Sequence, residues 1–121
     1  MHSSAVVGNI LNIALETAAD YDATKITEIN IEVGKLNWLR SDKLKYIFSV
    51  LSKDTLAENA ELIINETDVE IKCYNCDYSG PVNNIHDEIA PMVFCPKCGS
   101  HRVNVLKGYD LNIGNITIER P

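Results

Sequence analysis

The sequence predicts an α+β fold in which a small mixed β-sheet carries two helices and a four-cysteine module precedes the last strand. Two segments have apolar residues at helical spacing, and three others have the alternation or β-branched composition of strands. All four cysteines of the 121-residue chain fall between positions 73 and 98. The order helix, strand, helix, strand, cysteine module, strand is typical of an α+β core that contains an insertion.

The first helix is expected from Ser4 to about Asp20, with Ser3 or Ser4 as its N-cap. Its apolar residues are Val6, Val7, Ile10, Leu11, Ile13, Ala14 and Ala18. A second helix is predicted in SDKLKYIFSVLSKDT, where Ser41 is the expected N-cap. Its apolar stripe consists of Leu44, Ile47, Phe48 and Leu51. Both stripes are interpreted as core packing.

Three segments are predicted to be extended. In residues 25–33, KITEINIEV, the apolar Ile29, Ile31 and Val33 alternate with polar residues, which indicates a strand with one buried face. The stretch ELIINETDVEIK leads as one extended segment to Cys73. The closing strand is expected in YDLNIGNITIER, where Gly114 shifts the alternation as a bulge does.

Composition and charge exclude several classes of function. Hydrophobic residues make up 45% and charged residues 23%, and no apolar run approaches the roughly 20 residues that cross a bilayer. No secretory signal is recognisable, so a cytoplasmic protein without a membrane partner is expected. The net charge of −6 disfavours a nucleic-acid partner.

The cysteines form two C-x-x-C pairs, Cys73 with Cys76 and Cys95 with Cys98. In a reducing cytoplasm such pairs indicate metal ligation in place of disulfides. Each pair turns two sulfurs toward one ion, and two pairs complete a tetrahedron, which predicts a zinc-ribbon-like domain. Four thiolates leave no open position, so this zinc(II) is expected to be structural. Tetrahedral sulfur also suits iron, and coordination type alone leaves that alternative open.

The three histidines carry weaker signals. His86 and His101 flank the cysteines, and His101 is a candidate for a second metal, although a histidine there is more often a surface group. His2 follows the first residue, where an amine, a backbone nitrogen and an imidazole can close small chelate rings around one ion. Taken by itself, a histidine at this position is more often incidental.

Four stretches together resemble a known family. They are MH at the start, EVGKLNWLRSDKLKYIFSVLSKDTLAENAELII in the middle, the two C-x-x-C pairs, and GYDLNIGNITIE near the end. In this order they resemble the HypA/HybF hydrogenase maturation proteins, which are nickel metallochaperones that help to load nickel into [NiFe]-hydrogenases and, in some bacteria, urease. The resemblance covers essentially the whole chain.

The resemblance implies two domains, a nickel-binding α+β domain of residues 1–70 and 107–121 and a zinc-binding domain of residues 71–106. Nickel(II) falls on His2 with the backbone nitrogens of Met1, His2 and Ser3, and zinc falls on the four cysteines. Ser3 stands where the family generally has glutamate. The implied partners are a HypB-type GTPase and the large subunit of [NiFe]-hydrogenase.

Two other classes of function compete with this interpretation. One is a zinc ribbon that binds protein or nucleic acid without nickel, but acidic residues interrupt the lysines and arginines around the cysteines. The other is an enzyme. The sequence has no glycine-rich phosphate loop of the G-x-x-x-x-G-K-[ST] type and no open metal site, so catalysis is not expected.

Overall fold

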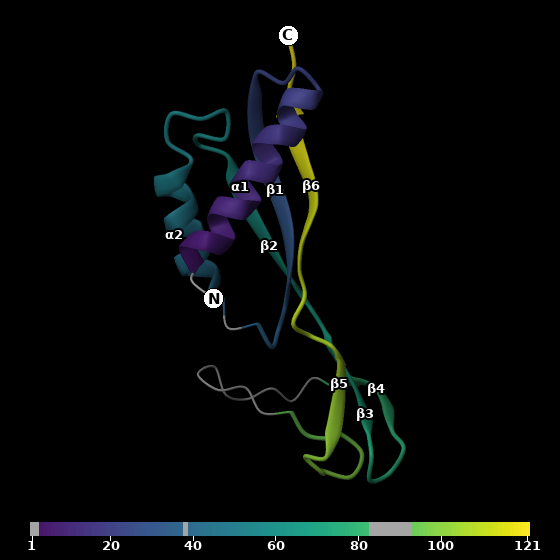
Figure 1. Ribbon diagram of the computed structural model, residues 1–121. Coiled ribbons are helices and arrows are strands. Elements are labelled where there is room, and N and C mark those ends of the chain that lie inside the picture. The colour runs from purple at the N-terminus through teal and green to yellow at the C-terminus, as the bar shows by residue number, and fades with distance from the viewer. Residues whose placement is uncertain (1–2, 38, 83–92) are drawn as a thin grey trace. The chain divides into compact units, whose positions relative to one another are not determined.

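The computed structural model describes residues 3–37, 39–82 and 93–121, and these residues form two helices and six strands (Figure 1). The elements in chain order are α1 (Ser3–Asp20), β1 (Lys25–Gly34), α2 (Ser41–Leu51), β2 (Glu61–Thr67), β3 (Val69–Cys73), β4 (Ser79–Val82), β5 (Val103–Lys107) and β6 (Leu111–Glu119). Among the described residues, neither helix is long and apolar enough to cross a membrane.

The chain divides into two compact units. The first unit comprises the described residues within Met1–Glu32, Leu39–Asn65 and Asn112–Pro121. The second unit comprises those within Val33–Trp38 and Glu66–Leu111. The chain therefore passes between the two units four times, and each unit has its own three-stranded sheet.

The sheet of the first unit has the order β2-β1-β6 and is mixed, as predicted. The Thr24 backbone N–H donates to the Glu119 carbonyl, and the Asn30 side chain donates to Asn115, so β1 and β6 run antiparallel. In Figure 1 the strands β1 and β2 run in the same direction, joined by the connection that contains α2. Parallel neighbours need such a crossover, which accounts for a helix between them.

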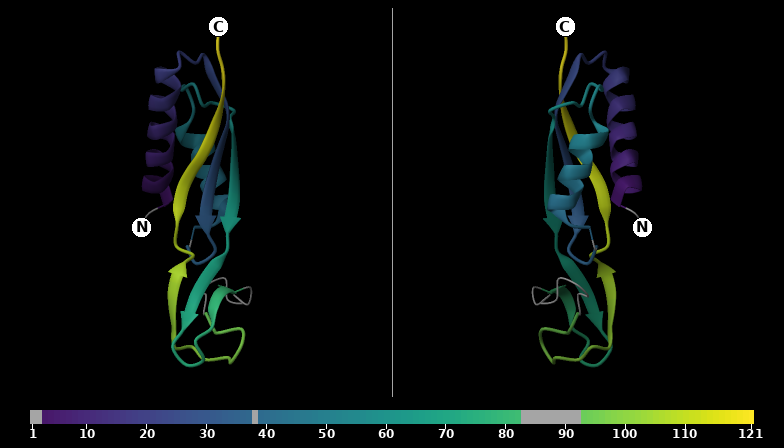
Figure 2. Two further views of the ribbon diagram at one scale, coloured as in Figure 1. Left: turned by 90° about the vertical axis from the view of Figure 1, so that its right-hand side faces the viewer. Right: turned by 90° about the vertical axis from the view of Figure 1, so that its left-hand side faces the viewer.

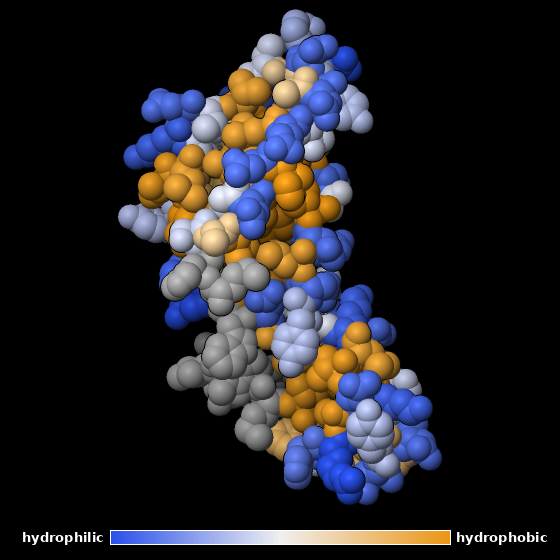
Figure 3. Space-filling model, in the orientation of Figure 1, coloured by the Kyte–Doolittle hydropathy of each residue, from blue (hydrophilic) through white to orange (hydrophobic). Residues whose placement is uncertain are grey.

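The helices bury most of their predicted apolar faces in the first unit, but Leu51 of α2, also predicted to pack in the core, is 41% exposed. Six α1 residues are buried, namely Val6, Val7, Ile10, Leu11, Ala14 and Ala18, while Ile13 is 52% exposed. Leu44 and Phe48 are the buried residues of α2, which packs against α1. Figure 2 shows α1 along one face of the sheet, and Figure 3 shows a hydrophilic stripe along its outer side. Burial on one face only is what an amphipathic helix requires.

Both predicted helix starts need correction. The first helix begins at Ser3, so Ser4 lies inside it and is not an N-cap. The N-cap of α2 is Arg40 and not Ser41, which is the first helical residue. Arg40 has extended backbone angles and offers no side-chain capping hydrogen bond. Instead, the carboxylate of Asp42 accepts a hydrogen bond from the backbone N–H of Lys43 in the first turn.

The strand predictions are confirmed for β1 and β6. The extended segment predicted between them is divided into two strands. Residues 61–72 are not one extended segment, because the chain leaves β2 after Thr67 and begins β3 at Val69, in the other sheet. Strands β4 and β5 were not predicted. In β6 the partly buried residues fall at alternate positions except at Gly114 and Asn115, which are both exposed, as the predicted parity shift requires.

The second unit has an antiparallel sheet of order β4-β3-β5. Leu36, Val69, Ile71 and Val82 form its buried cluster together with two cysteines. Two backbone hydrogen bonds hold the segment around Gly34 in place. The Gly34 N–H donates to the Asp110 carbonyl, and the Lys35 N–H donates to the Thr67 carbonyl. A Cβ added at Gly34 would lie 2.1 Å from the backbone oxygen of Gly108, so glycine is required by close approach of two backbones.

We expect Gly34→Ala to destabilise the protein by about 2–3 kcal/mol, because backbone atoms cannot yield as a flexible side chain does. The matched control is Gly8→Ala in α1, where an added Cβ meets nothing within 4 Å. That change should stabilise the helix by about 0.5–1 kcal/mol. Urea unfolding of both variants, saturated with zinc, measures the two effects, and equal stabilities would contradict the close-approach argument.

Candidate metal centre

The first C-x-x-C pair forms a tight turn at the end of β3, which we call the first knuckle (residues 73–78). Cys73 is fully buried and is itself a member of the apolar cluster of the second unit. Its backbone N–H donates to the Tyr78 carbonyl at 2.7 Å and closes the turn. The backbone N–H of Asn75 points at the Cys73 sulfur, 3.3 Å away. Backbone donors aimed at sulfur in this way stabilise a thiolate.

The second knuckle (residues 95–100) repeats the arrangement. The N–H of Cys95 donates to the Ser100 carbonyl, and the N–H of Gly99 donates back to the Cys95 carbonyl. Gly99 has φ of 78°, a left-handed conformation that suits glycine at this turn. A hydrogen bond from the Tyr74 N–H to the Arg102 carbonyl joins the first knuckle to the chain that follows the second knuckle. Each knuckle therefore presents its sulfurs from a turn fixed by backbone hydrogen bonds.

The four sulfur atoms meet in one cluster. All four lie within 4.8 Å of one another, with Cys73 to Cys98 at 3.7 Å and Cys76 to Cys95 at 3.5 Å. A zinc–sulfur bond of about 2.3 Å gives a tetrahedron with edges of about 3.8 Å, so both contacts fit four thiolates around one ion. A disulfide needs about 2.05 Å, and all four cysteines are free. The donor set and its spacing are suited to zinc.

The environment raises the pKa of one thiol in the cluster and lowers the pKa of two others. The pKa of Cys76 is raised to about 12, because burial and the three neighbouring sulfurs outweigh the Tyr78 backbone N–H, which acts to lower it. The pKa of Cys98 is lowered to about 6 by the Ser100 backbone N–H and the Asn75 side chain. Burial acts to raise the pKa of Cys95, but backbone N–H groups lower it by more. One proton at least must therefore leave when a cation binds at neutral pH.

Two other predicted site residues, His101 and Ser3, do not join this cluster. His101 is exposed, and the metal-ligand group found among the described residues contains the cysteines alone. Met1, His2 and His86 lie outside the described residues. Ser3 is the first residue of α1. Sequence reasoning missed Asn75, whose side-chain nitrogen lies 3.7 Å from the Cys98 sulfur.

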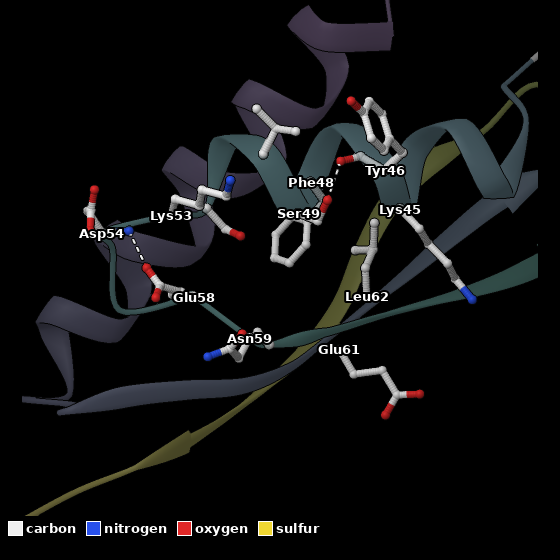
Figure 4. A pocket seen from close by; sticks show the side chains of 13 residues that line it. Lys45, Tyr46, Phe48, Ser49, Lys53, Asp54, Glu58, Asn59, Glu61 and Leu62 are labelled. Atoms are coloured by element: carbon white, nitrogen blue, oxygen red, sulfur yellow. Dashed lines mark hydrogen bonds between the residues drawn. The ribbon is translucent and has the colours of Figure 1, made fainter.

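A groove in the first unit is a further concave feature, with a volume of about 740 Å³. It lies between α2, the turn after it and the start of β2 (Figure 4). Phe48, Leu62 and Ser52 are its buried residues. Lys45 of α2 and Lys53 of the turn line the groove together with carboxylates from the turn and from the start of β2, and the described residues place no metal-ligand group there.

Comparisons with known proteins agree with this arrangement over the length of the chain. Residues 1–118 match the family model described as "Hydrogenase/urease nickel incorporation, metallochaperone, hypA". The chain belongs to the HypA family. The resemblance predicted from the sequence is thereby confirmed, and with it membership in a family of nickel metallochaperones for hydrogenase maturation.

Curated HypA relatives match at nearly full length. The hydrogenase maturation factor HypA of Methanothermobacter thermautotrophicus is 33% identical over 99% of this chain and 98% of its own. That of Methanobrevibacter smithii is 38% identical over 100% of this chain and 98% of its own. The solution structure of the nickel metallochaperone HypA from Helicobacter pylori has a TM-score of 0.65 at 20% identity, with both chains fully covered. It supports the predicted α+β fold.

Zinc affinity should fall with decreasing pH between pH 8 and 6, because Cys76 holds its proton throughout this range and must release it to bind the ion. Each released proton contributes about a tenfold loss per pH unit, and protonation of Cys98 adds to the loss near pH 6. Competition with a chromophoric chelator at several pH values measures this slope.

Two variants provide controls for that titration. Cys98→Ala removes one of the four sulfurs and should weaken zinc binding by at least about a hundredfold. His101→Ala should leave the affinity unchanged, since His101 lies outside the cluster. A pH-independent affinity, or a loss in the His101 variant, would contradict the four-sulfur site.

Proposed function

We propose that this protein is a nickel metallochaperone that binds nickel(II) at its N-terminus and delivers it during maturation of [NiFe]-hydrogenase, with a structural zinc on four cysteines. The observation that carries the proposal is the family match over residues 1–118. The proposed nickel-binding domain is residues 1–70 and 107–121, and the proposed zinc-binding domain is residues 71–106. Each includes most of one compact unit.

The proposed nickel ligands are the imidazole of His2 and the backbone nitrogens of Met1, His2 and Ser3. Nickel(II) accepts a square-planar set of nitrogen donors, which an amine, ionised amides and an imidazole supply. Support comes from the start of α1, since the first four N–H groups of a helix have no partner within it, and Ser3 is the first helical residue. An ionised amide there is negative, and the helix N-terminus favours negative charge.

Ser3 in place of the family's usual glutamate leaves this donor set intact, because the proposed donor is the backbone nitrogen. The first turn of α1 contains no acidic residue. The substitution therefore removes a carboxylate that would tune the site or orient its neighbours, without removing a ligand. We propose that it alters affinity or delivery more than the presence of the site.

Zinc is proposed for the cysteine cluster because two of its sulfur contacts match a tetrahedral edge and the cluster is closed by four thiolates. The zinc would hold the two knuckles together and so support folding of the second unit. Iron remains the competing metal for four sulfurs. Iron would give the purified protein visible absorbance, whereas zinc leaves it colourless, so a spectrum with metal analysis decides between them.

The proposed route places this protein in the cytoplasm between a HypB-type GTPase and the hydrogenase large subunit. Its role is transfer and not catalysis, so nucleotide hydrolysis in the pathway would belong to the GTPase. A zinc ribbon that only binds other macromolecules is the competing function. The family match favours the carrier, and nickel binding by the purified protein discriminates between the two.

Ser3→Pro and His2→Ala test the nickel ligands directly. Proline removes the backbone N–H at position 3 and is tolerated at the first position of a helix, so α1 should persist while nickel affinity falls by about a hundredfold or more. His2→Ala should abolish binding by removing the imidazole. Calorimetric nickel titration of protein with a free amine at Met1 measures both effects.

The matched control is Ser3→Ala, which changes the side chain and keeps the backbone N–H. It should bind nickel as the unchanged protein does. Zinc content and helical circular dichroism should be equal in all three variants. Unchanged nickel affinity in the His2 variant, or equal loss in both Ser3 variants, would refute the proposed ligand set.

A further inference from the structure

The four cysteine residues differ in their exposure to solvent. Cys73 and Cys95 are 0% and 2% exposed, Cys76 is partly buried, and Cys98 is exposed. A small polar oxidant in water therefore reaches Cys98 first. Oxidation of cysteine follows thiolate character and exposure, so one sulfur of the cluster is the preferred point of attack.

The sulfur in contact with Cys98 comes from the other knuckle. Cys73 lies 3.7 Å from it, and Asn75 lies against both members of this pair. The backbone N–H of Asn75 points at Cys73, and its side-chain nitrogen is 3.7 Å from Cys98. Cys76 and Cys95 make the second contact, at 3.5 Å. The cluster thus contains two sulfur pairs, each of which spans the two knuckles.

We propose that Cys98 is a peroxide-sensitive modification site and that its oxidation joins it to Cys73, across the knuckles and not within its own C-x-x-C pair. The proposal rests on the proposed zinc cluster, which keeps all four cysteines reduced and close together. Oxidation at this site would convert the second unit from a zinc-braced form to a disulfide form. Nickel transfer by this chain would then depend on the redox state of its surroundings.

The chemistry balances with hydrogen peroxide as the oxidant. The Cys98 sulfur attacks one peroxide oxygen, the O–O bond breaks, and the hydroxide that leaves takes a proton to become water. Cys73 then attacks the sulfenic sulfur, an S–S bond forms, the S–O bond breaks, and a second proton makes a second water. Two electrons pass from the two sulfurs to one peroxide.

A second peroxide closes the other pair. Once Cys73 and Cys98 are joined, Cys76 and Cys95 are two sulfurs 3.5 Å apart that no longer share a four-thiolate site. Two thiolates hold zinc much less well than four, so they become available to oxidant. Their disulfide consumes one more peroxide and two more protons. Complete reaction therefore releases one zinc for two peroxides and leaves two disulfides.

The test uses purified full-length protein whose zinc content is first measured. Peroxide is added in steps, zinc release is followed with a colorimetric chelator, and free thiols are blocked with an alkylating agent. Trypsin cleaves after Lys72 and Lys97, and chymotrypsin cleaves after Tyr74 and Phe94, so each cysteine falls in a separate peptide. Mass spectrometry then identifies the first disulfide without ambiguity.

The expected first product is the peptide Cys98–Arg102 linked to the peptide Cys73–Tyr74. Linkage to the peptide that contains Cys95 would overturn the proposal, as would oxidation of Cys98 to sulfinic acid with no disulfide. Protein that contains no zinc at the outset would instead refute the proposed zinc site. The two failures are therefore distinguishable.

Asn75→Ala provides a second measurement that does not depend on loss of a ligand. Removing its side chain takes a hydrogen-bond donor from Cys98 and makes that sulfur more basic and more nucleophilic. We expect the first oxidation to become about threefold faster, which corresponds to a tenfold gain in basicity. Asn104→Ala, an exposed asparagine on β5, is the matched control and should oxidise at the original rate. An unchanged rate in the Asn75 variant would contradict attack at Cys98.

Discussion

The meeting of four sulfurs within 4.8 Å is the constraint on which the second unit depends. Four thiolates so close together repel one another unless a cation neutralises them, and burial together with the neighbouring sulfurs raises the pKa of Cys76 to about 12. Apart from two of the cysteines themselves, the buried cluster of this unit contains four apolar members among the described residues, namely Leu36, Val69, Ile71 and Val82. A core of that size stabilises little by itself. The proposed metal binding and the folding of this unit would therefore be coupled.

The first unit differs from the second, because burial of apolar residues stabilises it. Its proposed metal ligands lie at the start of a helix. Six buried residues of α1 fix that helix against the sheet and against α2. Ser3 is then held in a defined helical turn although it lies near the N-terminus. A chelate that includes its nitrogen has one of its donors positioned by the fold. The packing of α1 thus supports the proposed nickel site without contributing a side chain to it.

The features that could be predicted from the sequence are those that depend on residues close together in the chain. Alternation identified Ile29, Ile31 and Val33, and C-x-x-C spacing identified the four sulfurs. The break at Asp68 could not be predicted, because β3 differs from β2 in its pairing partners and not in composition. The contacts of Asn75 arise from knuckle geometry, and the need for glycine at Gly34 arises from a distant carbonyl. Each missed feature depends on residues far away in the sequence or on turn geometry.

The proposed separation of nickel from zinc does not follow from affinity alone. Nitrogen and sulfur sites both follow the general order in which copper(II) binds more tightly than nickel(II). Selectivity must therefore come from geometry and from closure of the site. Two cysteines with at most 2% exposure give the sulfur site little freedom to flatten, which favours an ion without a planar preference. A nitrogen chelate at the helix start carries no such tetrahedral restriction, so a planar ion that must later leave is better held there.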